Sequence, residues 1–180
     1  MKTPSPIHWN CKEFNRPGDL GLFEGRGAML IHGVILIEGA MSPAHASSLE
    51  LIRENIRGAF DSEWRMRIRS PLILGDDLDP EPDIAVVAGP LPGQKEHPVT
   101  AELIIEVADS SLGFDCNEKR LLYARTGIRE YWVVDINGRR LLVFRDPVSG
   151  DYSTKKTFGP NDAVTPLAAA RAVKVAEMLM

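Results

Sequence analysis

The sequence predicts an α+β domain with a mixed β-sheet and two main helices. Three observations support this prediction. The apolar runs 84–88 and 101–108 have the length and composition of buried strands. Residues 129–145 are typical of a hairpin, and two further segments show helical spacing with start and stop signals. At 180 residues, the chain suits one domain with a sizeable core.

The first elements of the domain are short strands and a helix. The segment 28–38 (AMLIHGVILIE) predicts two short strands joined by a central turn. Ser42 and Pro43 supply an N-cap and a proline in the first turn, so we expect a helix over 43–58, where apolar residues recur at helical spacing. In 64–70 (WRMRIRS), apolar and polar residues alternate, which is typical of a half-buried strand.

The middle of the chain predicts two neighbouring strands. An acidic, proline-rich loop covers 71–83 and leads into the apolar strand 84–88. A long turn over 89–98 then connects this strand to the strand 101–108. We expect these two strands to be neighbours in one sheet.

The second half begins with a helix and continues as strands. Asp115 and Glu118 have the spacing of a capping box, and the helix that they predict ends at Gly127, a typical C′ residue. A hairpin follows, with Asn137-Gly138 at its turn, and 152–158 is a weaker strand. The stretch from residue 166 onward is compatible with either helix or strand.

Composition limits the classes of function. The formal net charge is −4 and the pI is near 5.6, which argues against a broad basic surface for nucleic acid. The two cysteines have no metal-ligand spacing and suit a reducing compartment. No apolar leader or membrane-spanning run occurs, so a cytoplasmic protein is expected. Residues 1–27 are rich in Gly, Pro and charge, and we expect an N-terminal arm with little regular structure.

Glu106 is an ionisable residue inside an otherwise apolar strand. A buried, unpaired carboxylate costs several kcal/mol or takes up a proton, so Glu106 should have a partner. Asp83 lies just before the neighbouring strand, after a proline that keeps the backbone extended. The two carboxylates can therefore meet at one end of the sheet, where Mg²⁺ would relieve their repulsion. The structural alternative is an ion pair between Glu106 and an arginine such as Arg120.

Several ordered motifs together resemble the Uma-two family of bacterial restriction endonucleases, within the PD-(D/E)XK nuclease superfamily. The motifs are PD (82–83), IIEVADSS (104–111), Asp115 with Lys119, YA..GI.EYWVVD (123–135) and VFR (143–145). The resemblance implies a restriction-endonuclease-like fold over 28–180, α/β-like, with a central mixed sheet flanked by helices. It also implies hydrolysis of DNA phosphodiester bonds with Mg²⁺ or Mn²⁺.

The same resemblance implies roles for individual residues. Asp83 and Glu106 would be catalytic acids and metal ligands, and the backbone carbonyl of Val107 would be a third ligand. The superfamily pattern has a lysine two residues after the second acid, where this chain has Ala108. Lys119, on the following helix, is expected to take that catalytic role. Met29 stands where the family pattern has an upstream glutamate.

Other side chains have both a structural and a functional interpretation. His45 lies on the apolar face of its helix and is most simply a core residue, but the resemblance includes a histidine here, so a supporting role near the site is an alternative. Arg65, Arg67 and Arg69 are most simply the solvent-facing side of a strand, but they could contact a nucleic-acid backbone.

The functional alternatives remain open on the sequence alone. A catalytically degenerate module with the nuclease fold, which binds nucleic acid or a protein partner, competes with the endonuclease. An assembly subunit whose strands pair with a second copy is a further alternative. A homodimer is expected in the endonuclease interpretation, because cutting both strands often takes two copies.

Overall fold

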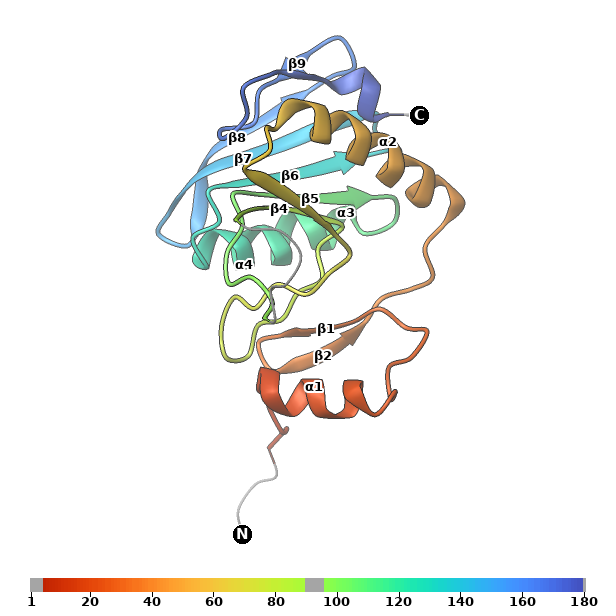
Figure 1. Ribbon diagram of the computed structural model, residues 1–180, viewed down its shortest axis with the longest axis vertical. Helices are drawn as coiled ribbons and strands as arrows, with labels where there is room; N and C mark the ends of the chain where they lie inside the picture. The colour runs from red at the N-terminus through yellow and green to blue at the C-terminus, as the bar shows by residue number, and fades with distance from the viewer. Residues whose placement is uncertain (1–4, 90–95, 180) are drawn as a thin grey trace.

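Strand-forming residues build the centre of the protein, a mixed sheet in which six strands follow the order β3-β4-β5-β6-β7-β8 (Figure 1). The computed structural model describes residues 5–89 and 96–179. The strands are β3 (Trp64–Ile68), β4 (Ile84–Ala88), β5 (Leu103–Ala108), β6 (Glu130–Asp135), β7 (Arg140–Val148) and β8 (Asp151–Phe158). Only β5 and β6 pair in parallel within this sheet. The predicted α+β class and the pairing of 84–88 with 101–108 are confirmed; of the predicted turn 89–98, residues 90–95 lie outside the described residues.

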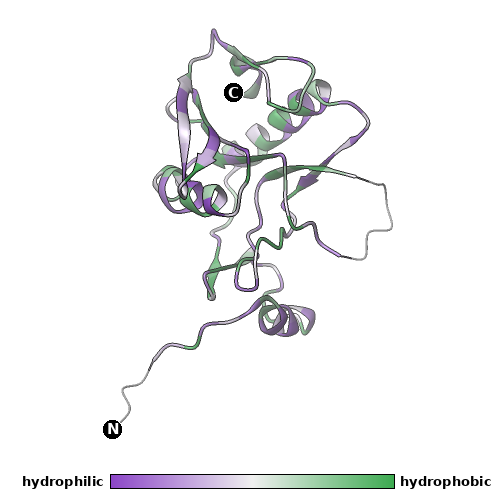
Figure 2. Cartoon of the chain, turned by 90° about the vertical axis from the view of Figure 1, so that its left-hand side faces the viewer, coloured by the Kyte–Doolittle hydropathy of each residue, from purple (hydrophilic) through white to green (hydrophobic). Residues whose placement is uncertain are grey.

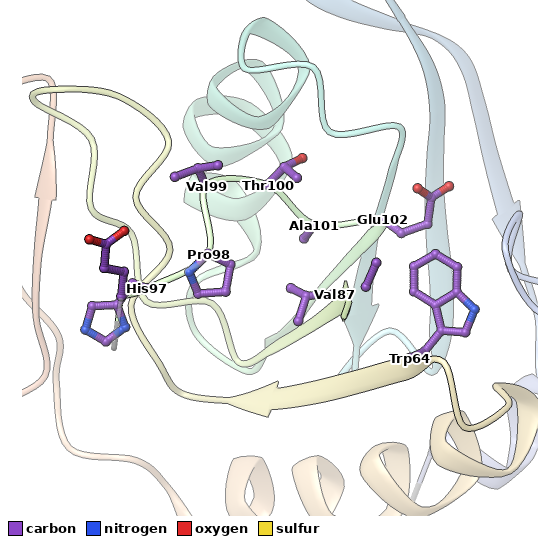
Figure 3. A pocket seen from close by; sticks show the side chains of 10 residues that line it. Trp64, Val87, His97, Pro98, Val99, Thr100, Ala101 and Glu102 are labelled. Carbon is purple, nitrogen blue, oxygen red and sulfur yellow. The ribbon is translucent and has the colours of Figure 1, made fainter. Parts of the chain in front are cut away.

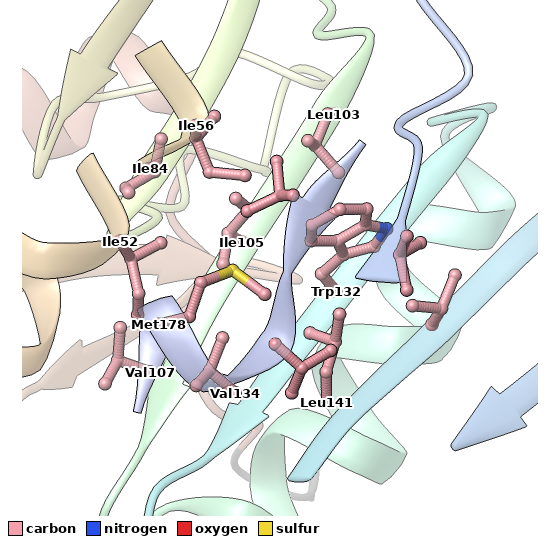
Figure 4. Close-up of a cluster of buried hydrophobic side chains, with 14 of the residues drawn as sticks. Ile52, Ile56, Ile84, Leu103, Ile105, Val107, Trp132, Val134, Leu141 and Met178 are labelled. Carbon is pink, nitrogen blue, oxygen red and sulfur yellow. The ribbon is translucent and has the colours of Figure 1, made fainter. Parts of the chain in front are cut away.

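Helices cover both faces of this sheet. On one face lies α2 (Pro43–Ala59), whose Ile52 and Ile56 belong to one buried cluster with Ile84, Ile105 and Trp132 (Figure 4). The other face carries one helical segment made of α3 (Leu112–Phe114), the π-helical turn η1 (Asp115–Lys119) and α4 (Arg120–Arg125). In Figure 2 the helices show hydrophilic and hydrophobic bands, as expected for helices that bury one side.

The helix before β6 differs from its prediction at the N-terminal end. It begins at Leu112 rather than after Asp115, and the Asp115 carboxylate accepts a hydrogen bond from Ser111 instead of capping the helix. The predicted capping box is therefore wrong, because the short loop after β5 lets the helix start earlier. The predicted C-terminal end is confirmed: Gly127 has a left-handed φ of +80° just after the helix.

The N-terminal arm is more regular than predicted. Residues 11–19 form α1 (Cys11–Asp19), which has a complete capping box between Asn10 and Glu13. Its Phe14 packs in a small apolar cluster with Leu30 of β1 (Ala28–Ile31), which forms a hairpin with β2 (Val34–Ile37). The expectation of little regular structure is wrong for this segment, because Asn10 caps a helix whose apolar side is covered by the hairpin (Figure 1).

The C-terminal stretch resolves into short pieces of both kinds. β9 (Ala163–Val164) pairs with β10 (Val173–Lys174), and the 3₁₀ turn η2 (Val175–Met178) follows. Met178 is buried in the same cluster as Ile52 of α2 (Figure 4). In the two described stretches of the chain, there is no helix with both the length and the apolar character that a membrane crossing requires.

Asp79 is a buried carboxyl group in the loop that holds β1. The residue is 3% exposed, and its Oδ1 has no hydrogen-bond partner among the described residues. Its backbone exchanges hydrogen bonds with Leu30, so the site cannot easily open to water. Burial, with a smaller effect of Glu81, raises the pKa of Asp79 from 3.8 to about 6. The native state therefore binds this proton more tightly than the unfolded chain does.

We expect Asp79→Asn to stabilise the protein at pH 7.5. Because the folded pKa is raised, the stability linked to the proton is complete below pH 3.8 and is lost as the pH rises through 6. A shift of this size corresponds to a gain of roughly 2–3 kcal/mol at pH 7.5 and almost none near pH 4. Urea unfolding at both pH values tests this, with Asp61→Asn, at an exposed position, as the control. A gain that does not depend on pH would contradict this explanation.

Candidate active site

Asp83 and Glu106 meet because of the register between β4 and β5. Ile84 pairs with Ile105, which brings the residue before β4 opposite the fourth residue of β5. The Val107 amide donates to Asp83 Oδ2 at 2.8 Å, and the Asp83 amide lies 3.4 Å from Glu106 Oε2. Both side chains are buried. The predicted convergence of the two acids at one end of the sheet is confirmed.

Lys119 approaches Asp83 and Glu106 from the helical segment that follows β5. Its Nζ lies 2.9 Å from Glu106 Oε2 and 3.5 Å from Asp115 Oδ1, and the side chain is buried. Lys119 is the last residue of the π-helical turn η1, and π-helical turns are common at functional sites. The alternative partner of Glu106, Arg120, pairs with Asp151 instead. Asp115, expected as a helix cap and as part of the family motif with Lys119, lies beside Lys119 in the cleft.

Tyr123 is a part of the site that the sequence did not predict. Its hydroxyl donates to Glu106 Oε1 at 2.9 Å, so both oxygens of this carboxylate have a partner. The ring is fully buried and packs at 5.0 Å, centroid to centroid, from the ring of Tyr131. The available signal was the helical spacing, because Tyr123 lies four residues after Lys119 and thus on the same side of the helix.

His45 lies beside Asp83 rather than in the apolar core. Its Nε2 is 3.0 Å from Asp83 Oδ1. The backbone of His45 is fixed by the helix cap, since its amide donates to Ser42 Oγ, and this hydroxyl donates to Asp109 at 2.6 Å. The structure therefore places His45 where the supporting interpretation requires it.

Arg65, Arg67 and Arg69, the possible nucleic-acid contacts, do not lie together in the structure. Arg69 lines the same cleft as the acids: its NH1 lies 3.8 Å from Asp83 Oδ1 and its NH2 lies 2.7 Å from Glu38 Oε2. Arg67 instead lies 3.0 Å from the Nδ1 atom of His97. Neither Arg65 nor Arg67 lines the cleft.

The cleft has a volume of about 460 Å³ and opens next to the buried acids. One wall comes from the β1–β2 hairpin and the residues after it, and the other comes from the loop after β5 and the start of its helix. Met29 is buried in the first wall. Glu38, which follows β2, supplies a carboxylate on this side of the cleft, and sequence reasoning missed it.

Burial and neighbouring charges shift the pKa values of Glu106, Lys119 and Asp83. Burial raises the pKa of Glu106 to about 8, although the Lys119 ammonium opposes the shift. Burial would lower the pKa of Lys119, but Glu106 and Asp115 outweigh it and hold the pKa above its ordinary value. Burial by itself would raise the pKa of Asp83, but the hydrogen bond from His45 helps to keep this pKa below its ordinary value. Asp83 is thus ionised at neutral pH.

The donor set fits a magnesium-like cation. Three buried carboxylates, those of Asp83, Glu106 and Asp115, line the cleft. The buried Lys119 ammonium contacts Glu106 and Asp115, and Asp115 Oδ1, 3.5 Å from it, accepts no hydrogen bond from the described residues. Across 5–89 and 96–179, no three side chains of His, Cys, Asp or Glu form a ready-made metal cage. Mg²⁺ does not need one, because it keeps several waters and binds through one or two carboxylates.

A separate cavity of about 550 Å³ lies near the edge of the sheet (Figure 3). Trp64 lines it at one end and His97 at the other, with Pro98 and Val87 between them. It contains none of the predicted catalytic residues. The residues that were predicted to be catalytic line the cleft at Asp83 and not this cavity.

Comparisons with known proteins show which fold and which family the chain shares. One similar solved structure is a crystal structure from Anabaena variabilis described as "a putative nuclease belonging to DUF820". The two chains are 16% identical with a TM-score of 0.69, and the match covers 84% of this chain and 88% of the other. At this identity the likeness shows a shared fold. No curated protein matches the chain.

The family comparison covers most of the chain. A family model named Uma2 and described as "Putative restriction endonuclease" matches residues 24–176. This range includes β1, every strand of the six-stranded sheet, and all the side chains of the candidate active site. The chain therefore belongs to the Uma2 family.

Proposed function

We propose that the protein is a divalent-metal-dependent endonuclease that hydrolyses DNA phosphodiester bonds. The family supports a nuclease with a nucleic-acid substrate. The observation that carries the proposal is that Asp83, just before β4, lies beside Glu106 of β5. Lys119 Nζ is 2.9 Å from Glu106. These groups line an open cleft, so a phosphodiester can approach them.

The proposed metal ligands are Asp83, Glu106 and the backbone carbonyl of Val107, with Mg²⁺ or Mn²⁺ as the ion. A bound divalent ion supplies Lewis-acid polarisation of the phosphate and a lowered pKa for water. His45 and the Val107 amide orient the Asp83 carboxylate through bonds of 3.0 and 2.8 Å. Tyr123 fixes Glu106 through Oε1, which leaves Oε2 directed at Lys119.

Lys119 has the remaining chemical role in this proposal. The surrounding carboxylates keep its pKa raised, so the ammonium is charged at neutral pH. A charged donor in a water-poor site stabilises negative charge that develops on the phosphoryl oxygens, or orients the attacking water. The phosphodiester is attacked by water, so no nucleophilic side chain is required.

Nicking of a supercoiled plasmid tests the proposal. We expect the wild-type protein to cut in Mg²⁺ or Mn²⁺ and to be inactive in EDTA. Asp83→Asn keeps the size of the side chain but removes a charged ligand, so the cleavage rate should fall at least about a hundredfold. Asp61→Asn, a surface aspartate purified in the same way, should cut like the wild type. Equal cleavage by wild type and Asp83→Asn would mean a contaminating nuclease and contradict the proposal.

A non-cutting module with the same fold is the second candidate. The observation that favours it is Met29, which lines the cleft where the family pattern has an upstream glutamate. In that case the wild type binds DNA or a protein partner without nicking the plasmid in either metal.

The expected homodimer and the expected cytoplasmic location remain predictions. Light scattering of the purified protein tests whether it is a dimer.

A further inference from the structure

The cleft holds many anionic groups and few cations. Its described lining includes the carboxylates of Glu38, Asp83, Glu106, Asp109 and Asp115, against the two strong cations Lys119 and Arg69. A phosphodiester is itself an anion, so it needs a cation that can reach it. Lys119 is committed to Glu106 and its side chain is only 6% exposed, whereas that of Arg69 is 26% exposed. Of these two cations, Arg69 is the more accessible to a phosphate that enters the cleft.

The backbone of Arg69 is held in an unusual conformation. Its φ is +42°, in the left-handed region that L-residues rarely adopt. Of the other described non-glycine residues with positive φ, His32, Arg139 and Ser149 lie in hairpin turns and Asp146 lies within β7, whereas Arg69 directly follows the edge strand β3. Its amide donates to the Asp83 carbonyl at 3.1 Å, which fixes the arginine beside the acid. Backbone strain of this kind is concentrated at functional sites.

The guanidinium of Arg69 is occupied by a replaceable anion. Arg69 NH2 donates to Glu38 Oε2 at 2.7 Å, and the Glu38 side chain is 24% exposed. Gly27 makes room for the pair, because a Cβ there would lie 3.0 Å from Glu38 Oε2 and 3.1 Å from Arg69 NH2. A guanidinium can form hydrogen bonds to two phosphate oxygens at once. The single contact with Glu38 is weaker than such a two-pronged interaction, so a phosphate can replace it.

We infer that Arg69 binds the substrate phosphate in the cleft and that Glu38 holds its guanidinium until that phosphate displaces it. The inference deepens the proposed function and rests on it, since the substrate is taken to be a nucleic-acid phosphodiester. Arg69 sits 3.8 Å from Asp83 Oδ1, so a phosphate held by it lies next to the acids. Glu38 thereby weakens the binding of any anion that cannot compete for Arg69.

The test measures DNA binding in EDTA, where no metal-dependent cleavage occurs. A short fluorescein-labelled duplex is titrated with wild type, Glu38→Gln, Arg69→Gln and the double variant, at several salt concentrations. Glu38→Gln should bind about tenfold tighter, because Arg69 is released. Arg69→Gln should bind about tenfold weaker, and the slope of log K against log salt should fall by about one. The double variant should behave like Arg69→Gln.

Matched controls separate this effect from a general change of charge. Glu50 and Arg53 form an exposed pair on α2, at 2.8 Å, so Glu50→Gln and Arg53→Gln make the same charge changes away from the cleft. Urea midpoints show that each variant is folded. Arg69→Lys keeps the charge but loses the two-pronged contact, and its affinity should be intermediate.

The outcomes distinguish this inference from the proposed function. It is overturned if Glu38→Gln gains no more affinity than Glu50→Gln, if the gain persists without Arg69, or if wild type and Glu38→Gln both fail to bind. Plasmid cleavage with unchanged binding by the Arg69 variants would contradict only the inference. Arg69-dependent binding without any cleavage would contradict only the metal-dependent chemistry.

Discussion

Replacing Lys119 with methionine is expected to slow metal-dependent plasmid cleavage by about 10²–10³-fold. Methionine fills a similar volume but carries no charge, so the variant loses the ammonium that is proposed to stabilise charge on the phosphoryl oxygens or to orient the attacking water. The same change should tighten the binding of Mn²⁺, because the ammonium that now sits 2.9 Å from Glu106 Oε2 no longer competes for that oxygen. Slower cleavage with stronger metal binding is a pattern that general damage to the fold would not produce.

The matched control for this variant is Lys155→Met. Lys155 also pairs with a carboxylate, that of Asp151 at 2.6 Å, but it is exposed on β8. Nicking rates and Mn²⁺ calorimetry on both variants provide the comparison. If Lys119→Met cleaved at the wild-type rate, Lys119 would have only a structural role as the partner of Glu106.

The largest effect on stability is expected for Glu130→Ala, with a loss of roughly 3–5 kcal/mol. Glu130 is fully buried, and its Oε1 accepts from Arg145 Nε and from the Trp132 indole, both at 2.7 Å. Its Oε2 accepts from the Leu167 amide at 2.6 Å, which ties the C-terminal stretch to the sheet. Removing the carboxylate leaves the fully buried Trp132 indole without its acceptor and takes away the acceptor of Arg145 Nε and of the Leu167 amide.

Urea unfolding measures this loss, and Glu102→Ala is the control. Glu102 also pairs with an arginine, Arg129 at 2.9 Å, but that arginine is 65% exposed. An exposed ion pair contributes about 1 kcal/mol or less, so the control should unfold close to the wild-type midpoint. Similar midpoints for the two variants would show that the network around Glu130 is not a main support of the fold.

The central part of the fold and the acid pair could be predicted because their signals are local and repeated. Apolar runs predicted the strands β4 and β5. Glu106 is an ionisable residue inside the second run, which indicated a buried carboxylate that needs a partner. Asp83 followed from its place before the neighbouring strand. Lys119 required the family resemblance, since nothing in its helix distinguishes it from a solvated lysine.

The remaining features depend on tertiary contacts. Asp115 and Glu118 match a capping box, but the length of the loop after β5 decides where the helix starts. The sequence of α1 contains Pro17 and few apolar residues, and the helix is supported by its cap and by Phe14 beside Leu30. The contact of Arg69 with Glu38 depends on a positive φ and on the space beside Gly27, neither of which a sequence pattern reports.

The central claim is that Asp83 and Glu106 together bind a divalent cation, and calorimetry with Mn²⁺ tests it most directly. Glu106→Gln keeps the size of the side chain and an oxygen for Tyr123, so it removes the charge with little change in packing. We expect the wild type to bind Mn²⁺ with one-to-one stoichiometry and Glu106→Gln to bind at least about a hundredfold more weakly. Equal affinities for the two proteins, or no binding by the wild type, would contradict the claim.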